Sequence, residues 1–161
     1  MRTLIVYATK HGTVARCARL IAERLPGGAD LADLRVTSAP GLDRHGAILI
    51  GGSIYAGRIQ SRVRRFCERN RESLLAHKVG LFICCLYAGP QAQAQLSDAF
   101  APWLSGHAFA SRPLGGAVRH SSLGPFERLL FRRITGTEDD LERIDYAALE
   151  ELAEATTRAL G

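Results

Sequence analysis

Five apolar segments that alternate with helical segments are the strongest constraint on the fold of this chain. The predicted strands are residues 2–8, 29–36, 45–53, 79–87 and 110–118, and the predicted helices are residues 13–25, 61–76, 91–105 and 145–160. Nearly continuous apolar strands that alternate with helices are typical of a parallel sheet covered on both faces. The order βαββαβαβα therefore predicts an α/β fold with a doubly wound, five-stranded sheet.

The length of 161 residues predicts one domain, residues 1–161. The sequence has no apolar run of about 18 residues that would span a membrane, and we find no signal-peptide cleavage site, so we expect a cytoplasmic protein. Its four cysteines lack metal-ligand spacing and its five histidines are scattered. We therefore expect reduced thiols and no metal site.

Positive charge is concentrated before residue 138. The chain carries a net charge of +5, but residues 138–161 contain eight acidic and two basic residues, so residues 1–137 carry 19 bases against 8 acids. Arginine supplies 19 of the 21 basic residues and binds carboxylate or phosphate through paired hydrogen bonds. This bias favours an anionic partner. Nucleic acid is not expected, because no zinc pattern, aromatic RNA-binding signature or long basic tail is present.

The sequence "TKHGTV", residues 9–14, connects the first predicted strand to a helix. Such a turn presents backbone N–H groups at the positive end of a helix dipole, which is an anion site and most often a phosphate site. Thr9 and Thr13 offer hydroxyl groups, Gly12 allows close approach, and Lys10 adds charge. The sequence matches neither GxGxxG nor GxxxxGK, and similar turns also occur without a ligand.

Two further strand ends are rich in small residues and carry tyrosines. "GGSIYAGRIQS", residues 51–61, contains Tyr55, and "CCLYAGP", residues 84–90, contains Tyr87. Amide groups of such loops can bind the edge of a planar ring while an aromatic side chain stacks on its face. Each loop alone is equally compatible with an ordinary turn. Together with a phosphate loop, they indicate flavin mononucleotide (FMN).

The chain resembles flavodoxin-domain proteins over nearly its whole length, and within them the bacterial menaquinone-dependent protoporphyrinogen oxidases. The resemblance is carried by "TLIVYATKHGTV" (3–14), "IGGSIYAGRIQSRVRRFCERN" (50–70) and "GGAVRHSSLGPFERLLFRRITGTEDD" (115–140). It implies a flavodoxin-like sheet with strand order 2-1-3-4-5. It also implies FMN-dependent oxidation of protoporphyrinogen IX to protoporphyrin IX in haem biosynthesis, with a quinone as electron acceptor.

By this resemblance, FMN would contact three loops. These are Thr9, Lys10, His11, Gly12, Thr13 and Val14; Ser53, Ile54, Tyr55, Ala56 and Gly57; and Leu86, Tyr87, Ala88 and Gly89. The chain departs from the family in two places. Val14 stands where flavodoxins usually have a hydroxyl residue, and residues 79–97 lack the longer basic segment of the oxidases.

Arginine residues near the loops are the candidate substrate ligands. Arg58 and Arg119 follow predicted strand ends, so we expect them to bind the propionates of a porphyrinogen. No catalytic side chain is assigned, because flavin N5 is the hydride acceptor. Residues 58–71 carry a net charge of +5 and form either a solvated face or an anion-attracting rim.

Residues 124–134 combine Phe126, Leu129, Leu130 and Ile134 with Arg128, Arg132 and Arg133. This basic amphipathic segment is either a packed helix or a peripheral contact with the anionic inner face of the cell membrane, where a quinone would be met.

Three other functions are compatible with the sequence: a flavodoxin-like electron carrier, another flavin-dependent reductase, or a binding module. A phosphorelay receiver is disfavoured, because "YATKHG" lacks acidic residues.

Overall fold

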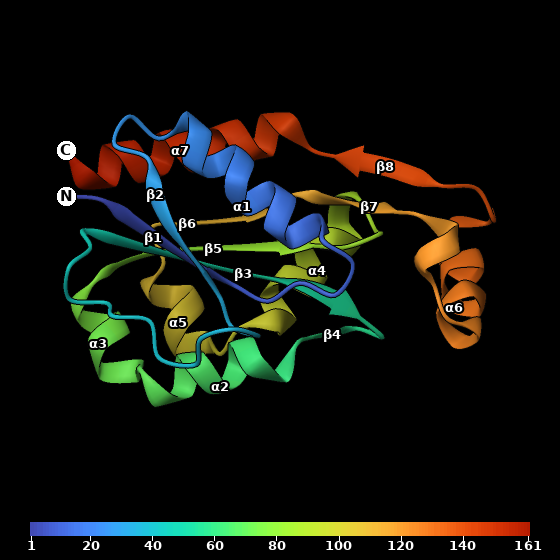
Figure 1. Ribbon diagram of the computed structural model, residues 1–161, viewed down its shortest axis with the longest axis horizontal. Coiled ribbons are helices and arrows are strands. Elements are labelled where there is room, and N and C mark those ends of the chain that lie inside the picture. Colours follow the sequence, from blue (N-terminus) through green and yellow to red (C-terminus); the bar gives the residue numbers. More distant parts are fainter.

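A parallel sheet forms the centre of the computed structural model, which describes residues 1–161 (Figure 1). Its strands are β1 (Thr3–Tyr7), β2 (Ala29–Asp33), β3 (Ala47–Tyr55), β5 (Lys78–Cys84) and β6 (Ala110–Pro113). They run in the order β2-β1-β3-β5-β6, and all four neighbouring pairs are parallel. The short strand β4 (Arg58–Ile59) pairs antiparallel with the end of β3. The predicted α/β class and strand order are confirmed.

Helices cover both faces of the sheet, as Figure 1 shows. Helices α1 (Thr13–Arg24) and α7 (Tyr146–Leu160) lie on one face, and α2 (Ser61–Arg69), α3 (Arg71–Ala76), α4 (Gly89–Ala99) and α5 (Pro102–His107) lie on the other. Successive residues of a strand enter different cores: Ile5 and Leu49 pack with α1 and α7, whereas Leu4 and Ile48 pack with the opposite layer. The strands are apolar throughout because both sides are buried.

Two of the predicted helices, 61–76 and 91–105, are each divided in two. Asn70 lies between α2 and α3, and its side-chain amide donates to the Phe66 carbonyl at 2.8 Å, which caps the end of α2. Pro102 begins α5 after the extended residue Ala101. Proline restricts the preceding residue to extended conformations, so α4 cannot continue through this point.

The predicted strand 110–118 is wrong as one element. Strand β6 ends at Pro113, and β7 (Gly115–Val118) leaves the sheet to pair antiparallel with β8 (Leu141–Ile144), which the sequence did not predict. Gly115 has φ of +74°, and a Cβ there would lie 1.8 Å from the Arg143 carbonyl oxygen. Only glycine fits this position, because β8 crosses so close to the backbone.

Residues 119–140 form an excursion between β7 and β8. It contains a short 3₁₀ turn (His120–Ser122) and helix α6 (Pro125–Thr135), which ends at Gly136 with φ of +72°. In Figure 1, α6 stands beyond the carboxyl ends of the parallel strands, at the opposite end of the molecule from both termini. The excursion therefore places a helix over the edge where ligands bind in doubly wound sheets.

Candidate functional site

A cavity of about 340 Å³ lies at the carboxyl ends of β1, β3 and β5. The loops that follow β1 and β3 form part of its wall, together with the end of β5, strand β7 and the inner face of α6. Twelve of the fifteen predicted cofactor residues line it; the exceptions are Gly12, Ala88 and Gly89. Its size lies in the range of small-ligand pockets.

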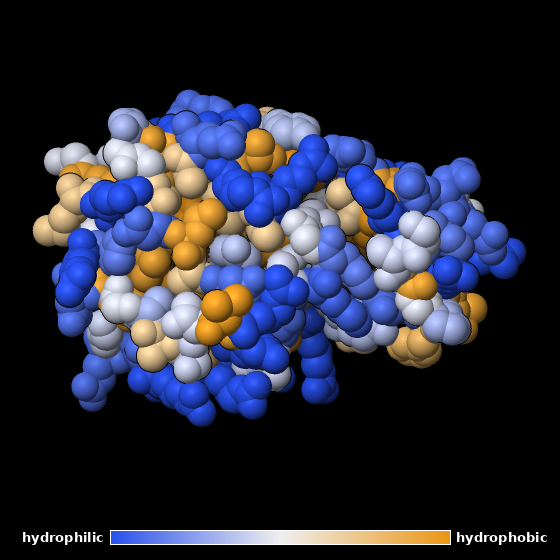
Figure 2. All heavy atoms as spheres, in the orientation of Figure 1, coloured by the Kyte–Doolittle hydropathy of each residue, from blue (hydrophilic) through white to orange (hydrophobic).

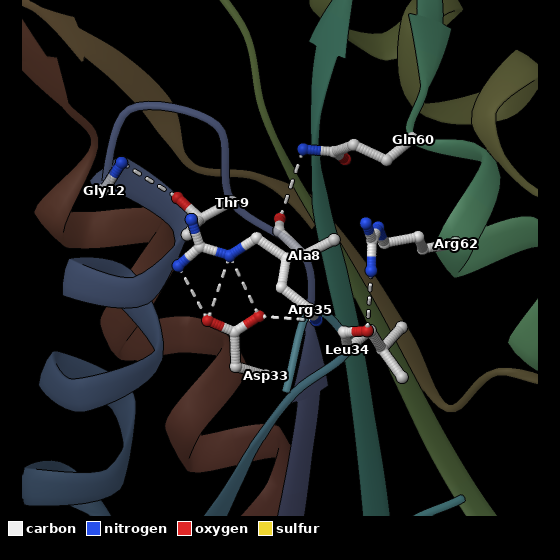
Figure 3. Close-up of polar contacts among 8 residues, drawn as sticks. All are labelled: Ala8, Thr9, Gly12, Asp33, Leu34, Arg35, Gln60 and Arg62. Atoms are coloured by element: carbon white, nitrogen blue, oxygen red, sulfur yellow. Dashed lines mark hydrogen bonds and ion pairs between the residues drawn. The ribbon is translucent and has the colours of Figure 1, made fainter. Parts of the chain in front are cut away.

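The loop of residues 9–14 is held in shape by its own hydroxyl groups. The Gly12 N–H donates to Thr9 Oγ1 at 3.0 Å, and Gly12 has φ of +90° (Figure 3). The Thr13 hydroxyl donates to the Ala117 carbonyl at 2.8 Å, which joins the loop to β7. Val14 is fully buried beneath the loop. A valine at this position packs into the core, where a hydroxyl group would need a partner.

The start of α1 offers unused hydrogen-bond donors. The backbone N–H groups of Thr13, Val14 and Ala15 have no acceptor, and no acidic residue lies in the first turn. Lys10 and His11 add donor side chains beside them. Free N–H groups at the positive end of a helix favour binding of an anion such as phosphate.

The carboxylate of Glu127 lies across this loop. Glu127, on α6, accepts a hydrogen bond from His11 Nε2 at 2.6 Å and lies 3.6 Å from Lys10 Nζ. Burial raises the pKa of the Glu127 carboxyl, but the hydrogen bond from His11 and the charge of Lys10 outweigh it, so this pKa is lowered. No motif in the sequence indicated Glu127, although it is the only acidic residue in "GPFERLLFRRI".

Tyr55 forms the rim of the cavity on the loop after β3. Lys10 Nζ lies 3.7 Å from the centre of its ring, and Phe126 of α6 packs edge-on at 6.5 Å between ring centres. Ala56 and Gly57 follow with φ of +49° and +76°, which turns the chain into β4. Tyr87 lines the cavity after β5. Two tyrosine rings therefore border the space predicted for a planar ring.

Gln60, which the sequence analysis did not single out, connects two of these loops. Its side-chain N–H₂ donates to Ser53 Oγ at 2.6 Å and to the Ala8 carbonyl at 3.3 Å (Figure 3), and its oxygen accepts from the Ser53 N–H at 2.9 Å. Gln60 therefore fixes the distance between the ends of β1 and β3. A lone glutamine before a helix gives no pattern by which to find it.

Arg58 and Arg119, the predicted substrate ligands, do not line the main cavity. Arg58 is exposed on β4. Arg119 is also exposed and borders a second, polar cavity of about 560 Å³ with Arg16 and Arg19, which residues 11–13 of the first loop also line. The structure contains no cluster of three or more His, Cys, Asp or Glu side chains that could hold a metal ion. No helix is long and apolar enough to cross a membrane.

The main cavity fits FMN in its chemistry. FMN has an anionic phosphate at one end and a flat, largely apolar ring at the other. The cavity is lined by Thr13 and Val14, whose N–H groups are unused, and by Tyr55, Tyr87 and apolar residues of α6, with Lys10 between the loop and the Tyr55 ring.

Solved structures of similar fold come from several redox proteins. Rubredoxin:oxygen oxidoreductase from Desulfovibrio gigas has a TM-score of 0.62 at 16% identity, over 99% of this chain but only 36% of that protein. Flavodoxin 1 from Bacillus cereus has a TM-score of 0.61 at 14% identity, over 98% of both chains. The flavodoxin, WrbA-like protein from Agrobacterium tumefaciens has a TM-score of 0.59 at 16% identity, over 99% of this chain and 94% of that chain.

These likenesses concern the fold, because all three identities are low. The chain spans about a third of the length of the Desulfovibrio protein. No curated protein matches the sequence. The family model of the flavodoxin domain matches residues 4–144, most of the chain. The chain therefore belongs to the flavodoxin domain family.

Proposed function

We propose that this protein is an FMN-dependent oxidoreductase that oxidises a porphyrinogen and passes the electrons to a membrane quinone such as menaquinone. One observation carries the cofactor assignment. Thr13 and Val14, whose N–H groups are unused, line an apolar cavity bordered by two tyrosines, in a chain that belongs to the flavodoxin domain family. The porphyrinogen and quinone are supported by the resemblance of residues 115–140 and by the arginine excess.

The residues have separate tasks in this proposal. The N–H groups of residues 13–15 and the Lys10 ammonium bind the FMN phosphate, while Tyr55 and Tyr87 border the ring. FMN supplies a hydride acceptor, the flavin N5. Leu130, Phe131 and Ile134 of α6 line the opposite wall and exclude water from the ring.

Binding of FMN requires a local change at α6. The Glu127 carboxylate pairs with the side chains of Lys10 and His11, which are the same side chains that would face the phosphate. Lys10 also covers the Tyr55 ring. Because a carboxylate and a phosphate repel each other, we propose that Glu127 moves away from the loop when FMN binds.

The substrate would meet the ring edge at the rim, because a cavity of about 340 Å³ does not hold a flavin and a tetrapyrrole together. Porphyrinogen carries two propionates, which call for cationic side chains. Arg58 and Arg119 are exposed at different parts of this end of the molecule. Neither arginine has an acidic partner within 4 Å, so both are available to bind propionates.

The test is anaerobic turnover of the FMN-loaded protein with protoporphyrinogen IX and menaquinone, followed by porphyrin fluorescence. We expect Arg58→Ala and Arg119→Ala to lower kcat/KM by about 10- to 100-fold, the loss of one charge-assisted pair, while FMN content is unchanged. Arg158→Ala is the matched control, because Arg158 lies near the C-terminus on α7, at the other end of the molecule.

Absence of porphyrin formation by FMN-loaded protein would contradict the substrate assignment. Reduction of the same preparation by a protein reductase, slowed in the Arg58 and Arg119 variants, would instead identify an electron carrier.

We propose that α6 meets the membrane in which the quinone is dissolved. Phe126 and Leu129 of this helix are 64% and 66% exposed, and Phe126 also packs edge-on against Tyr55. Arg128, Arg132 and Arg133 are exposed on the same helix, and Figure 2 shows hydrophobic and hydrophilic surface together at this end of the molecule. Protruding apolar side chains surrounded by arginine suit the interface of an anionic bilayer.

Sedimentation with phosphatidylglycerol vesicles tests this contact. Binding should fall with rising salt, because exposed charges are screened within about 8 Å at physiological ionic strength. The triple change of Arg128, Arg132 and Arg133 to Gln should abolish binding. The same change at Arg64, Arg65 and Arg69, exposed on α2, removes equal charge and should leave most of the binding. Equal losses in both variants, or no binding at low salt, would contradict a contact through α6.

A further inference from the structure

Two buried thiols meet beneath the main cavity. The Cys84 thiol, on the last residue of β5, donates to Cys17 Sγ on α1, and the two sulfur atoms are 3.7 Å apart. Cys17 is fully buried and Cys84 is 3% exposed. Cys84 also lines the cavity, whereas Cys17 does not. A small molecule in the cavity therefore reaches Cys84 before Cys17. Cys85 also lines the cavity, but its thiol donates to the Tyr87 carbonyl at 3.5 Å and has no sulfur partner.

The environments of the four cysteines differ. The hydrogen bond from Cys84 lowers the pKa of the Cys17 thiol, while the same bond and burial raise the pKa of Cys84. Burial raises the pKa of Cys85, and it raises the pKa of Cys67 to about 12. Cys17 is the only cysteine with a lowered pKa. Within the pair, the hydrogen bond therefore stabilises the thiolate of Cys17, which can accept the proton of Cys84.

We propose that Cys17 and Cys84 form a reversible disulfide when a peroxide enters the cavity. In the first step, the Cys84 proton passes along the hydrogen bond to the Cys17 thiolate, Cys84 Sγ attacks one peroxide oxygen, and Cys17 returns the proton to the departing hydroxide. The O–O bond breaks, Cys84 becomes a sulfenic acid, and one water leaves. In the second step, Cys17 Sγ attacks the sulfur of Cys84, the S–O bond breaks, and a second water leaves.

The reaction is balanced with hydrogen peroxide as the oxidant. Two thiols lose two electrons and two protons, and one peroxide becomes two waters. The sulfur atoms must approach from 3.7 Å to a bond length of about 2.05 Å. Cys67 lies on α2 in the opposite core, and its thiol has no sulfur partner, so it has no route to the same product.

The disulfide would connect the two segments that frame the candidate FMN site. Cys17 follows the loop of residues 9–14 by one helical turn, and Cys84 precedes the loop of residues 86–89. On the proposed function, bound FMN fills the cavity and covers Cys84. Peroxide should then oxidise the pair several-fold more slowly in the FMN-loaded protein. The disulfide itself does not depend on that proposal.

The test is oxidation of the full chain with hydrogen peroxide, followed by mass spectrometry of the intact and digested protein. We expect a mass about 2 Da lower, one peptide that links Cys17 to Cys84, and recovery with dithiothreitol. Cys67→Ser, the matched buried control, should form the same link. Cys17→Ser should lose the link and accumulate about 32 Da on Cys84 as sulfinic acid.

Three results would overturn the proposal: four free thiols after oxidation, a link between Cys84 and Cys85, or the same Cys84 oxidation in wild type and Cys17→Ser. An equal rate of linking with and without FMN has a different meaning. It would agree with the proposed disulfide between Cys17 and Cys84 and would contradict the position of FMN over Cys84.

Discussion

Replacing Gly12 by Asp should abolish tight FMN binding, whereas replacing it by Asn should leave most of the affinity. A Cβ at Gly12 would meet no atom within 4 Å, so neither change creates a steric clash. Both side chains must adopt φ near +90°, which costs an L-residue about 1–2 kcal/mol, and Asn and Asp are the side chains that tolerate this region best. The cost to the fold is therefore nearly the same in the two variants.

The two variants differ in one negative charge beside the phosphate. For a carboxylate about 5 Å from a phosphate of charge −2, Coulomb's law gives about 2 kcal/mol in water and about 7 kcal/mol at an effective dielectric of 20. The lower figure is about 30-fold in Kd. Quenching of flavin fluorescence measures Kd for both variants, and urea unfolding checks that both are folded. Equal FMN affinity of Gly12→Asp and Gly12→Asn would refute a phosphate on residues 9–14.

Glu127→Gln should raise FMN affinity, because it removes an anion from Lys10 and His11; weaker binding by this variant in the same titration would contradict our account. The lowered pKa of Glu127 means that its contact with the loop stabilises α6 above the unfolded pKa, near 4.3, and that this stability is lost as the pH falls through the lower folded value. Hydrogen exchange of the α6 amides should therefore accelerate at acidic pH in wild type but show no such step in Glu127→Gln. Gly51→Ala should lower the free energy of unfolding by about 1–3 kcal/mol, because its Cβ would lie 2.1 Å from the buried Phe82 ring. Gly106→Ala, whose Cβ meets nothing, is the control in urea unfolding, and equal stability of both variants would contradict the packing of β3 against β5.

The central sheet could be predicted from the sequence because its strands are buried on both sides and are therefore apolar throughout. Continuous apolar runs such as residues 79–87 indicate buried strands, and their alternation with helices predicts a parallel sheet. The strand order came from the resemblance to flavodoxin-domain proteins. The loop of residues 9–14 was also predictable as a turn between a strand and a helix, because it separates a continuous apolar run from a helical pattern.

The excursion of residues 119–140 was not predictable in its placement. The pattern of Phe126, Leu130 and Ile134 indicated an amphipathic helix, but not which surface it faces. That choice depends on Gly115, where the chain leaves the sheet, and on β8, which is only four residues long. The contact between Glu127 and the phosphate loop joins residues 116 positions apart, and no local pattern encodes it.

Comparison of FMN with riboflavin is the most direct test of the central claim, which is that residues 9–14 bind the phosphate of a flavin. Riboflavin has the same ring but no phosphate. Equilibrium titration of the purified protein should give one FMN per chain and an affinity for FMN about 100-fold or more above that for riboflavin, as expected for two or more charge-assisted hydrogen bonds. Equal affinities for FMN and riboflavin, or no binding of either, would contradict the account.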